Sequence, residues 1–368
     1  MKILVTGSEG FIGKNLLFYL KCRGYPDSSI AVFNRDTPRK NLRSLVLSSD
    51  LVINLAGVNR STADQPFYDV NVDLVREIVS ICKNHLHLIP IFNASSLHAA
   101  GESVYGRSKK IAEDILLDYQ NQGGSSFAPR LPGIFGKWGR PNYNSFVNTL
   151  CYNFSRNIQT NLFEKDKNLS LIYIDDLIEN LITWIESGGD NHTWIDMPVY
   201  EKSIGDLYCS VKEISETFKK DCPAGVGSGF ERALYATYVS YLDKDNHVIP
   251  LDLKKDARGI FCELVKTADS GQFCFFTCRP GEVRGGHVHN TKLERFFVLS
   301  GVAKFTSVNC SSGETFELTL KPYQNGVVSA PGWRHTIQNI GDSDLICALW
   351  VNEKFNSLKP DTFHFGVE

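Results

Sequence analysis

The sequence predicts an α/β protein in two parts, an N-terminal doubly wound parallel sheet followed by a C-terminal all-β jelly-roll barrel. Three observations support this prediction. A glycine-rich turn directly follows the first apolar run, apolar runs then alternate with helical stretches to about residue 245, and short β runs separated by turn residues fill the rest of the chain. We place the boundary near residue 246, which gives domains 1–245 and 246–368.

The first domain is predicted from continuous apolar runs, which are typical of strands buried on both faces of a sheet. The expected strands are residues 2–6, 30–34, 51–55 and 89–94. Helices are expected from Phe11 to Leu20 and near 71–84 and 106–120. Strands that alternate with helices at this spacing indicate a parallel sheet of the Rossmann type.

The second domain is predicted from a change of pattern after about residue 245. A polar stretch closed by Pro250 leads into short runs rich in aromatic and β-branched residues, namely FCELV, QFCFFTC, RFFVLSG, AKFTSV, TFELTL, VVSA and ICALWV. Runs of this length between turn residues indicate an antiparallel barrel or jelly roll.

The bulk composition excludes several classes of function. The chain has 368 residues, 42% hydrophobic and 22% charged, with a formal net charge of −2, so no nucleic-acid partner is expected. It has no run of 18 apolar residues and no recognisable signal peptide, so no membrane association is expected. The ten cysteines form no CxxC pair and fit reduced thiols in a cytoplasmic protein.

The turn after the first strand has the spacing of a dinucleotide-binding motif. Gly7, Gly10 and Gly13 follow a strand and open a helix. The first glycine permits a tight turn, the second lets the backbone approach a pyrophosphate, and the third allows close packing of helix on strand. The free N–H groups of the helix start would face the phosphates. A plain glycine-rich turn is the alternative interpretation, and the strand context argues against it.

Arg35 at the end of the second strand bears on the choice of coenzyme. An acidic residue there would bind a ribose 2′-hydroxyl, whereas an arginine suits a 2′-phosphate. The sequence therefore predicts NADPH rather than NADH. A solvated surface arginine beside Asp36 is the alternative interpretation.

Tyr105 and Lys109 have the spacing of an acid–base pair, because positions i and i+4 share one face of a helix. An ammonium beside a phenol stabilises the phenolate, so we expect Lys109 to lower the pKa of Tyr105 and to make it a proton donor and acceptor near neutral pH. Ser96 follows a predicted strand and could bind a carbonyl oxygen.

These motifs together resemble the extended short-chain dehydrogenases/reductases that act on nucleotide sugars. The resemblance rests on TGSEGFIG at 6–13, NLAG at 54–57, Ser96, the Tyr105–Lys109 segment, PGIFGKW at 132–138 and YIDD at 173–176. It implies that Ser96, Tyr105 and Lys109 are catalytic. It also implies cofactor contacts from Tyr105, Lys109, Gly7, Gly10, Phe11, Ile12, Gly13, Arg35, Leu55, Ala56 and Gly57. The sugar-binding half is short for this family.

Four residues of the second domain have the spacing of metal ligands: His287, His289, Glu294 and His335. The first two histidines would point to one face of a strand. Three imidazoles and one carboxylate suit Zn, Fe, Mn or Ni, and one divalent ion is expected, with zinc as the first choice. Histidines that merely line a polar pocket are the alternative. The spacing resembles the two sequence blocks of the cupin family, which implies a metal centre.

Two further patterns are less specific. The segment 256–263, with Asp256, Arg258, Gly259, Phe261 and Glu263, resembles the entry strand of the deoxysugar 3,5-epimerase cupins, and a charged surface strand is an equal alternative. The histidines at 85 and 87 have ligand spacing but no acidic or cysteine partner nearby, so we interpret them as ordinary residues at a helix end or in a loop.

The whole chain resembles bifunctional capsule-precursor enzymes that fuse a nucleotide-sugar reductase to a cupin. The segments that carry this resemblance are NLAGVNR at 54–60, GKWGRPNYNS at 136–145, LYATYVSYL at 234–242 and VNEKF at 351–355. It implies a UDP-linked 2-acetamido-2,6-dideoxy-4-hexulose as substrate. The cupin would invert C3, and NADPH-dependent reduction at C4 would give UDP-2-acetamido-2,6-dideoxy-L-talose, a UDP-N-acetyl-L-fucosamine precursor for capsule or O-antigen.

Two rival interpretations stay open. The first is a nucleotide-sugar dehydratase or C4-epimerase with tightly bound NAD and a cupin used for binding or assembly. Such dehydratases usually carry an acid pair between the serine and the tyrosine, where this chain has only Glu102. The second is a binding module attached to an inactive reductase fold. A homodimer is expected, because cupin surfaces and reductase helix pairs commonly self-associate.

Overall fold

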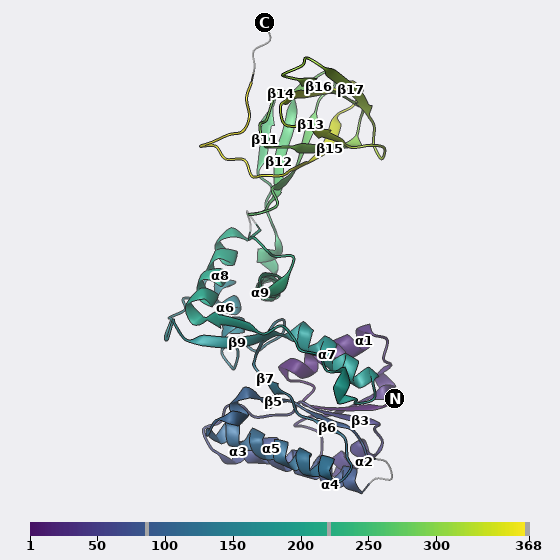
Figure 1. Cartoon of the computed structure of the whole chain (residues 1–368), viewed down its shortest axis with the longest axis vertical. Coiled ribbons are helices and arrows are strands. Elements are labelled where there is room, and N and C mark those ends of the chain that lie inside the picture. The colour runs from purple at the N-terminus through teal and green to yellow at the C-terminus, as the bar shows by residue number, and fades with distance from the viewer. Residues whose placement is uncertain (85–87, 219–221, 365–368) are drawn as a thin grey trace. The chain divides into compact units, whose positions relative to one another are not determined.

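The structure is a computed structural model that describes residues 1–84, 88–218 and 222–364 (Figure 1). Residue contacts divide the chain into two units, Met1–Val211 with Ala233–Leu242, and Lys212–Arg232 with Asp243–Glu368. The predicted boundary near residue 246 is a single cut, whereas these contacts group Lys212–Arg232 with the second unit. The backbone explains the grouping, because the N–H of Cys222 donates to the carbonyl oxygen of Lys266 at 2.7 Å.

A five-stranded parallel sheet is the centre of the first unit. Its strands, in spatial order, are β2 (Ile30–Phe33), β1 (Ile3–Thr6), β3 (Leu51–Asn54), β4 (Ile91–Asn93) and β6 (Ser126–Phe127). Every neighbouring pair is parallel, so the predicted Rossmann-type sheet is confirmed. Because β2 and β3 lie on opposite sides of β1, the strand order reverses at β1, where α/β sheets form their ligand crevices.

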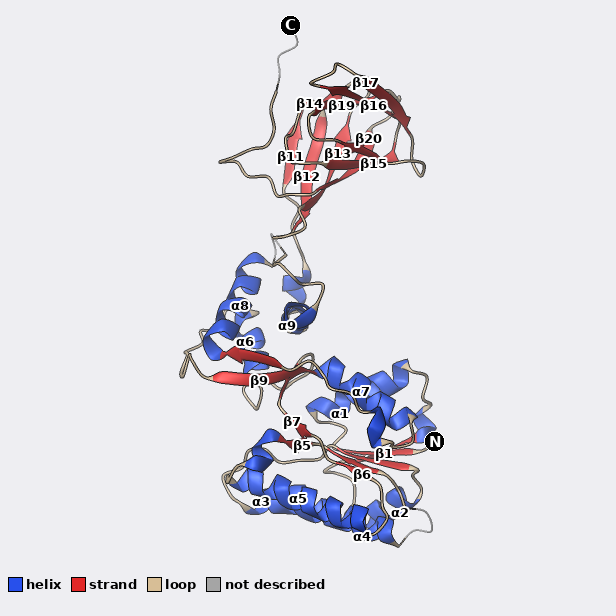
Figure 2. Cartoon of the chain, in the orientation of Figure 1, coloured by secondary structure: helices blue, strands red, loops and turns tan. Residues whose placement is uncertain are grey.

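Helices cover both faces of this sheet (Figure 2). One layer contains α1 (Phe11–Cys22) and α7 (Ile174–Glu186), and the other contains α2 (Leu42–Leu47), α4 (Leu74–Lys83) and α5 (Val104–Asn121). The apolar side chains of Leu4 and Val52 on the strands pack with Ile78 and Leu116 on the second layer, and all four are almost fully buried. The apolar periodicity that predicted these helices therefore reflects their contact with the sheet.

The other elements of this part of the chain are two small sheets and several further helices. Two small sheets contain β10 (Tyr200–Ser203), β9 (Asn168–Tyr173) and β8 (Gly133–Phe135), and β5 (Ser95–Ser96) with β7 (Arg130–Leu131). The other helices are α3 (Gln65–Tyr68), α6 (Phe146–Phe154), α8 (Ile204–Thr217) and α9 (Gly229–Val239). Among the described residues, no helix has both the length and the apolar character needed to cross a membrane.

Two antiparallel sheets make up most of the second unit, so the predicted all-β C-terminal region is confirmed. One contains, in spatial order, β11 (Leu253–Asp256), β12 (Gly259–Lys266), β13 (Gln272–Cys278), β20 (Leu345–Val351), β15 (Glu294–Ser300) and β18 (Val327–Ser329). The other contains β14 (Val283–His287), β19 (Trp333–Asn339), β16 (Ala303–Asn309) and β17 (Thr315–Leu320).

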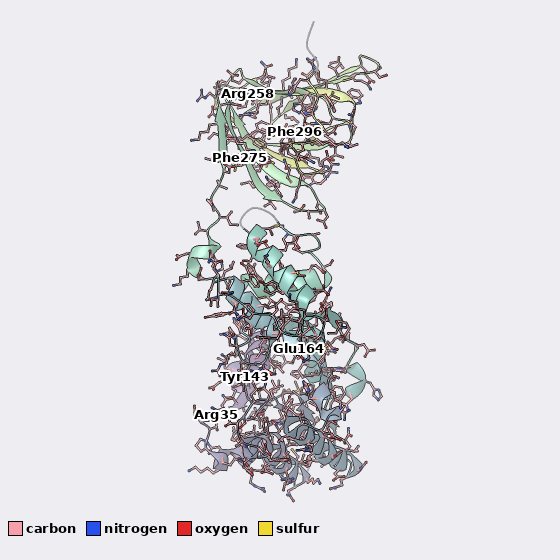
Figure 3. The ribbon with its side chains drawn as sticks, turned by 90° about the vertical axis from the view of Figure 1, so that its left-hand side faces the viewer. Arg35, Tyr143, Glu164, Arg258, Phe275 and Phe296 are labelled. Carbon is pink, nitrogen blue, oxygen red and sulfur yellow. The ribbon has the colours of Figure 1, made fainter. Side chains whose placement is uncertain are left out.

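The core of the second unit joins side chains from both sheets. Phe296 of β15 and Phe305 of β16 belong to one buried cluster, and their ring centroids lie 5.7 Å apart. Along β13, Cys274 and Phe276 are buried while Phe273 is exposed, which is the alternation expected of a strand with one face on a core. Figure 3 labels Phe275 on β13 and Phe296 on β15.

Candidate functional site

A large cavity of about 2140 Å³ opens in the first unit where the strand order reverses. Its lining comes from the glycine-rich turn after β1, the residues that follow β2 and β3, the start of α5, and the loop 138–145. Arg35 and Tyr143, both labelled in Figure 3, belong to this lining. The cavity is therefore bounded by the segments from which the sequence predicts coenzyme and substrate contacts.

Two glycines shape the turn after β1. Gly7 has a φ of +66°, and a Cβ there would lie 2.7 Å from the Cα and the N of Ala56. A Cβ at Gly13 would lie 2.4 Å from the carbonyl oxygen of Gly7. Any side chain at either position would push α1 or the turn after β3 away from β1. The close approach of three backbone segments thus requires these glycines.

The first turn of α1 faces this cavity. Phe11, Ile12 and Gly13 line it, and the N-cap residue Gly10 has an extended backbone and no side chain with which to cap the helix. The first N–H groups of a helix have no intrahelical partners, so they can bind an anion such as a pyrophosphate. Residues 55–57 also line the cavity.

The residues after β2 add a cation. Arg35 lines the cavity and makes no ion pair with any residue that the structure describes. Nearby Arg39 differs, because its guanidinium is paired with Glu77 at 2.5 Å. Asn34 is held by the N–H and the hydroxyl of Ser8, each of which donates to its Oδ1 at 3.0 Å. The backbone that carries Arg35 is thereby tied to the glycine-rich turn.

The three predicted catalytic residues come together at β5 and the start of α5. Ser96 is 8% exposed, its hydroxyl accepts from the N–H of His98 at 3.3 Å, and it lies near enough to Tyr105 to affect the pKa of the phenol. Lys109 is 7% exposed, and its Nζ lies 6.0 Å from the centroid of the Tyr105 ring. The same Nζ donates to the carbonyl oxygen of Ala94 at 2.8 Å and would lie 3.3 Å from a Cβ at Gly57.

The pKa values of this set differ from the expectation. Burial raises the pKa of Tyr105, and the hydrogen bond with Ser96 opposes that rise only in part. Burial also lowers the pKa of Lys109 to about 8, against a smaller opposing effect of Glu113. The expected lowering of the phenol pKa is therefore wrong for this structure, because desolvation of the phenol is the largest effect on it.

Asn71 lies in no recognised motif but holds the turn after β3. Its side chain accepts from the N–H of Val58 at 2.9 Å and donates to the Val58 carbonyl and the Ser108 hydroxyl, each at 2.9 Å. It lies in a π-helical turn, Asp69–Asp73, and such turns are frequent at functional sites. A polar residue on the apolar side of an expected helix was the signal available in the sequence.

Two segments that carry the family resemblance meet in space. Lys137 of PGIFGKW forms an ion pair with Asp175 of YIDD, and the hydroxyl of Tyr19 donates to the same carboxylate at 2.8 Å. The loop that follows is strained, since Trp138 and Asn142 have φ values of 67° and 57°. Both residues line the large cavity, so the ion pair anchors one end of a cavity wall.

The four predicted metal ligands gather in the second unit, with their ligand atoms within 4.8 Å of one another. Glu294 comes from one sheet, whereas His287 and His335 face each other in the register of β14 and β19. The Oε2 atom of Glu294 lies 2.9 Å from Nε2 of His335, 3.6 Å from Nε2 of His289 and 3.9 Å from Nε2 of His287.

This cluster has the electrostatics of a cation site. Burial would raise the pKa of Glu294, but the facing imidazoles lower it well below its usual range. Nδ1 of His289 donates to the backbone carbonyl oxygen of Asp361, which can only accept. Nε2 of His289 is buried and hydrogen bonds to no other atom of the described residues. An imidazole with one nitrogen occupied and the other turned inward is typical of a metal ligand.

A second cavity of about 250 Å³ adjoins the cluster and is lined in part by His287, His289 and Glu294. Lys292 lines it as well and is only 5% exposed. Its Nζ lies 5.5 Å from the ring centroid of Phe355, and it forms no ion pair with a residue in the described part of the chain. No sequence pattern identified this residue, because a lysine in a polar turn is usually solvated.

The segment 256–263 has two structural roles. The carboxylate of Asp256 accepts from the N–H groups of Arg258 at 2.9 Å and Gly259 at 3.2 Å, which closes the turn between β11 and β12. Phe261 and Glu263 line the smaller cavity. The first half of the pattern thus forms a turn, and the second half forms part of the cavity wall.

One histidine outside the cluster, His98, lies near the predicted catalytic residues. His98 lines the large cavity, and its ring centroid lies 6.0 Å from that of Tyr105. The histidines at 85 and 87 lie outside the described residues. Proximity of His98 to the phenol could not be inferred from its isolated position in the sequence.

Comparison with known proteins gives a match for each unit. Residues 3–195 match the NAD dependent epimerase/dehydratase family, and residues 254–363 match the Polysaccharide biosynthesis C-terminal domain. The first match contains the glycine-rich turn, Ser96, Tyr105 and Lys109. The second contains the cluster of histidines and Glu294.

Two relatives extend over the whole chain. The UDP-2-acetamido-2,6-beta-L-arabino-hexul-4-ose reductase of Pseudomonas aeruginosa is 38% identical over 100% of this chain and 99% of its own length. The crystal structure of the capsular polysaccharide assembling protein CapF from Staphylococcus aureus has a TM-score of 0.87 and 32% identity, with 100% of both chains covered. A crystal structure of CapF with the inhibitor 3-isopropenyl-tropolone has a TM-score of 0.82 and 29% identity over the same share.

These matches span both units and include the crevice and the histidine cluster, and they confirm the resemblance of the whole chain to capsule-precursor enzymes. The chain therefore belongs to the NAD dependent epimerase/dehydratase family and, over its full length, to the CapF-type proteins that join this fold to a polysaccharide biosynthesis C-terminal domain.

Proposed function

We propose that this protein is a bifunctional nucleotide-sugar enzyme that epimerises a UDP-2-acetamido-2,6-dideoxy-4-hexulose at C3 and then reduces it at C4 with NADPH. The product would be UDP-2-acetamido-2,6-dideoxy-L-talose, a UDP-N-acetyl-L-fucosamine precursor in capsule or O-antigen biosynthesis. One observation carries the proposal: the chain holds a Ser96–Tyr105–Lys109 set at the cavity of one unit and a His/Glu cluster beside a cavity in the other. The hexulose reductase named above supports the substrate class.

The crevice of the first unit fits a dinucleotide. The glycines at 7 and 13 let the turn after β1 lie close to the backbone of Ala56 and to helix α1, where a Cβ would not fit. The first turn of α1 offers N–H groups to a pyrophosphate. Arg35 would bind the 2′-phosphate. NADPH bound there supplies the hydride that C4 receives. Leu55, Ala56 and Gly57 would contact it from the turn after β3.

The reduction needs a proton for the C4 oxygen. Tyr105 is the donor, since its raised pKa keeps the phenol protonated near neutral pH. Ser96 lies near the phenol and would hold the carbonyl oxygen beside it. Lys109 lies one helical turn after Tyr105. Its ammonium would bind ribose hydroxyls and stabilise the phenolate left after proton transfer.

The epimerisation needs a base and a stabilised oxyanion. Removal of the proton at C3 leaves an enolate whose charge is on the C4 oxygen, and return of a proton on the other face inverts C3. Lys292 would stabilise that oxygen, because the residue is only 5% exposed, lacks an ion-pair partner among the described residues and lines the cavity beside the cluster.

His287, His289, Glu294 and His335 would hold one divalent ion, with zinc preferred. The fit rests on the buried Nε2 of His289, whose ring is already oriented through Nδ1, and on a carboxylate whose pKa is held low by three imidazoles. A bound ion would polarise an oxygen of the substrate or tie the two sheets together. We further propose that the second unit is a cupin barrel.

A homodimer is also proposed. The outer face of the six-stranded sheet exposes Phe273, Phe297 and Val328, at 41%, 43% and 52%, on three of its strands. Large apolar side chains gathered on one sheet face are usual at contacts between subunits.

Replacement of Tyr105 tests whether reduction at C4 and epimerisation at C3 occur at two separate sites. Tyr105→Phe should lower the rate of NADPH oxidation with the 4-keto sugar by about 10²–10⁴-fold, because it removes the proton donor. Deuterium exchange at C3 in D2O, followed by mass spectrometry without NADPH, should persist. Tyr323→Phe, at a tyrosine that is 96% exposed, is the matched control and should leave both rates unchanged. Loss of both activities in Tyr105→Phe contradicts the assignment.

Replacement of Arg35 tests whether the protein prefers NADPH to NADH. Arg35→Ala should raise the KM for NADPH about 10- to 100-fold, since a hydrogen bond to a charged group contributes about 1.5–3 kcal/mol. The KM for NADH should hardly change. Arg43→Ala, at an exposed arginine outside the cavity lining, is the control. Equal losses with the two coenzymes would mean that Arg35 does not contact the 2′-phosphate.

The buried ammonium predicts a pH dependence for the reduction. Burial lowers the pKa of Lys109 to about 8, so the charged fraction falls as the pH rises through that value. The kcat/KM for NADPH oxidation should therefore decline above about pH 8. Lys109→Arg should be slower but should lose this decline, because a guanidinium stays protonated. A decline that survives in Lys109→Arg would show that another group titrates.

Replacement of a cluster histidine tests the metal centre. His287→Ala should lose bound metal, measured by elemental analysis after dialysis, and should lose C3 deuterium exchange. Reduction of a sugar that is already epimerised should continue, because the crevice uses other residues. His247→Ala changes an exposed histidine of the same unit and should keep the metal. Loss of reduction in His287→Ala would mean that the two activities depend on each other.

A further inference from the structure

The residues Asp361–His364 pass beside the His/Glu cluster, although they follow the last strand of the second unit. Val288 and Phe363 exchange two backbone hydrogen bonds, each of 3.0 Å. Thr362 lines the smaller cavity, and the ring centroid of His364 lies 5.6 Å from that of His287. We call Asp361–His364 the strap.

We propose that Asp361 is a positioning residue of this centre, which it organises through its backbone carbonyl and its carboxylate together. The inference rests on the proposed function of the cluster as a metal site, and it goes further by naming what prepares that site for the ion.

The carbonyl of Asp361 sets the orientation of one ligand. It accepts from Nδ1 of His289, so the proton of the neutral imidazole is on Nδ1 and the lone pair is on Nε2. Nε2 then points toward Glu294, 3.6 Å away. This is the usual arrangement by which an outer group fixes the tautomer and the ring plane of a metal-binding histidine.

The carboxylate of Asp361 fixes the turn that connects two ligands. It accepts from the backbone N–H groups of Thr291 and Lys292, each at 2.8 Å, and of Asn290, at 3.0 Å and 3.1 Å to its two oxygens. The hydroxyl of Thr291 donates to it at 3.2 Å. Three consecutive N–H groups that converge on one carboxylate leave the turn between His289 and Glu294 little freedom.

The same turn delivers Lys292 to the cavity wall. Its backbone N–H is bound by Asp361, while its side chain is 95% buried beside Phe355. The next residue is fixed independently, since the N–H of Leu293 donates to Oδ1 of Asn352 at 2.9 Å. Loss of the Asp361 carboxylate would therefore free the turn that carries Lys292, and it would also loosen the attachment of the carbonyl that orients His289.

A simpler hypothesis is that Asp361 only stabilises the turn. The two hypotheses predict different effects on the unfolding temperature and on the metal affinity. A stabilising contact would lower the unfolding temperature of the metal-free protein but would leave the affinity of the folded protein for the ion unaltered. A positioning role must change the affinity and the ligand geometry.

The test measures Zn²⁺ affinity of the full chain by competition with a chelating dye, and the visible absorption of the Co²⁺-substituted protein. The variants are Asp361→Asn and Asp361→Ala, with Asp342→Asn as the matched control. Asp342 is exposed and forms no hydrogen bond or ion pair with other residues that the structure describes. A chain that ends at residue 360, compared with one that ends at 364, removes the carbonyl as well.

We expect Asp361→Ala to bind Zn²⁺ about 10- to 100-fold more weakly, the usual effect of losing an outer partner of a metal ligand. Asp361→Asn should fall between it and the wild type, and the Co²⁺ spectrum should change in both. Asp342→Asn should match the wild type. An affinity within twofold of wild type in Asp361→Ala, with only a lower unfolding temperature, overturns the inference. A wild-type chain that binds neither ion overturns the proposed metal centre instead.

Discussion

The buried ammonium of Lys109 is the constraint on which the crevice of the first unit depends. A charge removed from water must be met by polar groups, and here the Ala94 carbonyl accepts from it at 2.8 Å. The ammonium also lies close to the backbone of Gly57, where no side chain would fit without crowding. One side chain thus links the turn after β3, the end of β4 and helix α5. Tyr105 is positioned by the same helix, one turn before Lys109.

A second constraint of the same kind organises the C-terminal unit. Glu294 from one sheet faces His287 and His335 from the other, so the polar cluster and the apolar core around Phe305 close the same pair of sheets. A lone buried carboxylate would be unfavourable, and its low pKa reports how strongly the imidazoles compensate. The two units therefore each place a charged group where surrounding residues are fixed by packing.

Local patterns in the sequence were sufficient for much of this arrangement. Apolar runs identified the parallel strands, and the spacing of Tyr105 and Lys109 placed them on one helical face. The direction of the Tyr105 pKa was wrong, because burial depends on the whole crevice and not on the neighbouring residue. Asn71, Lys292 and the Lys212–Arg232 segment went unrecognised for the same reason. Their roles arise from contacts with segments far away in the chain, such as the backbone hydrogen bond between Cys222 and Lys266.

The link between His289 and Asp361 has a consequence for biosynthesis. The two residues are 72 positions apart, and every residue of the first unit precedes position 243. A ribosome that adds about 5–20 residues per second needs roughly 4–14 s to pass from one partner to the other. During that interval the nucleotide crevice can already have folded, while the imidazole still lacks the carbonyl that orients it. Folding of the crevice and completion of the His/Glu cluster would then occur at different stages of synthesis.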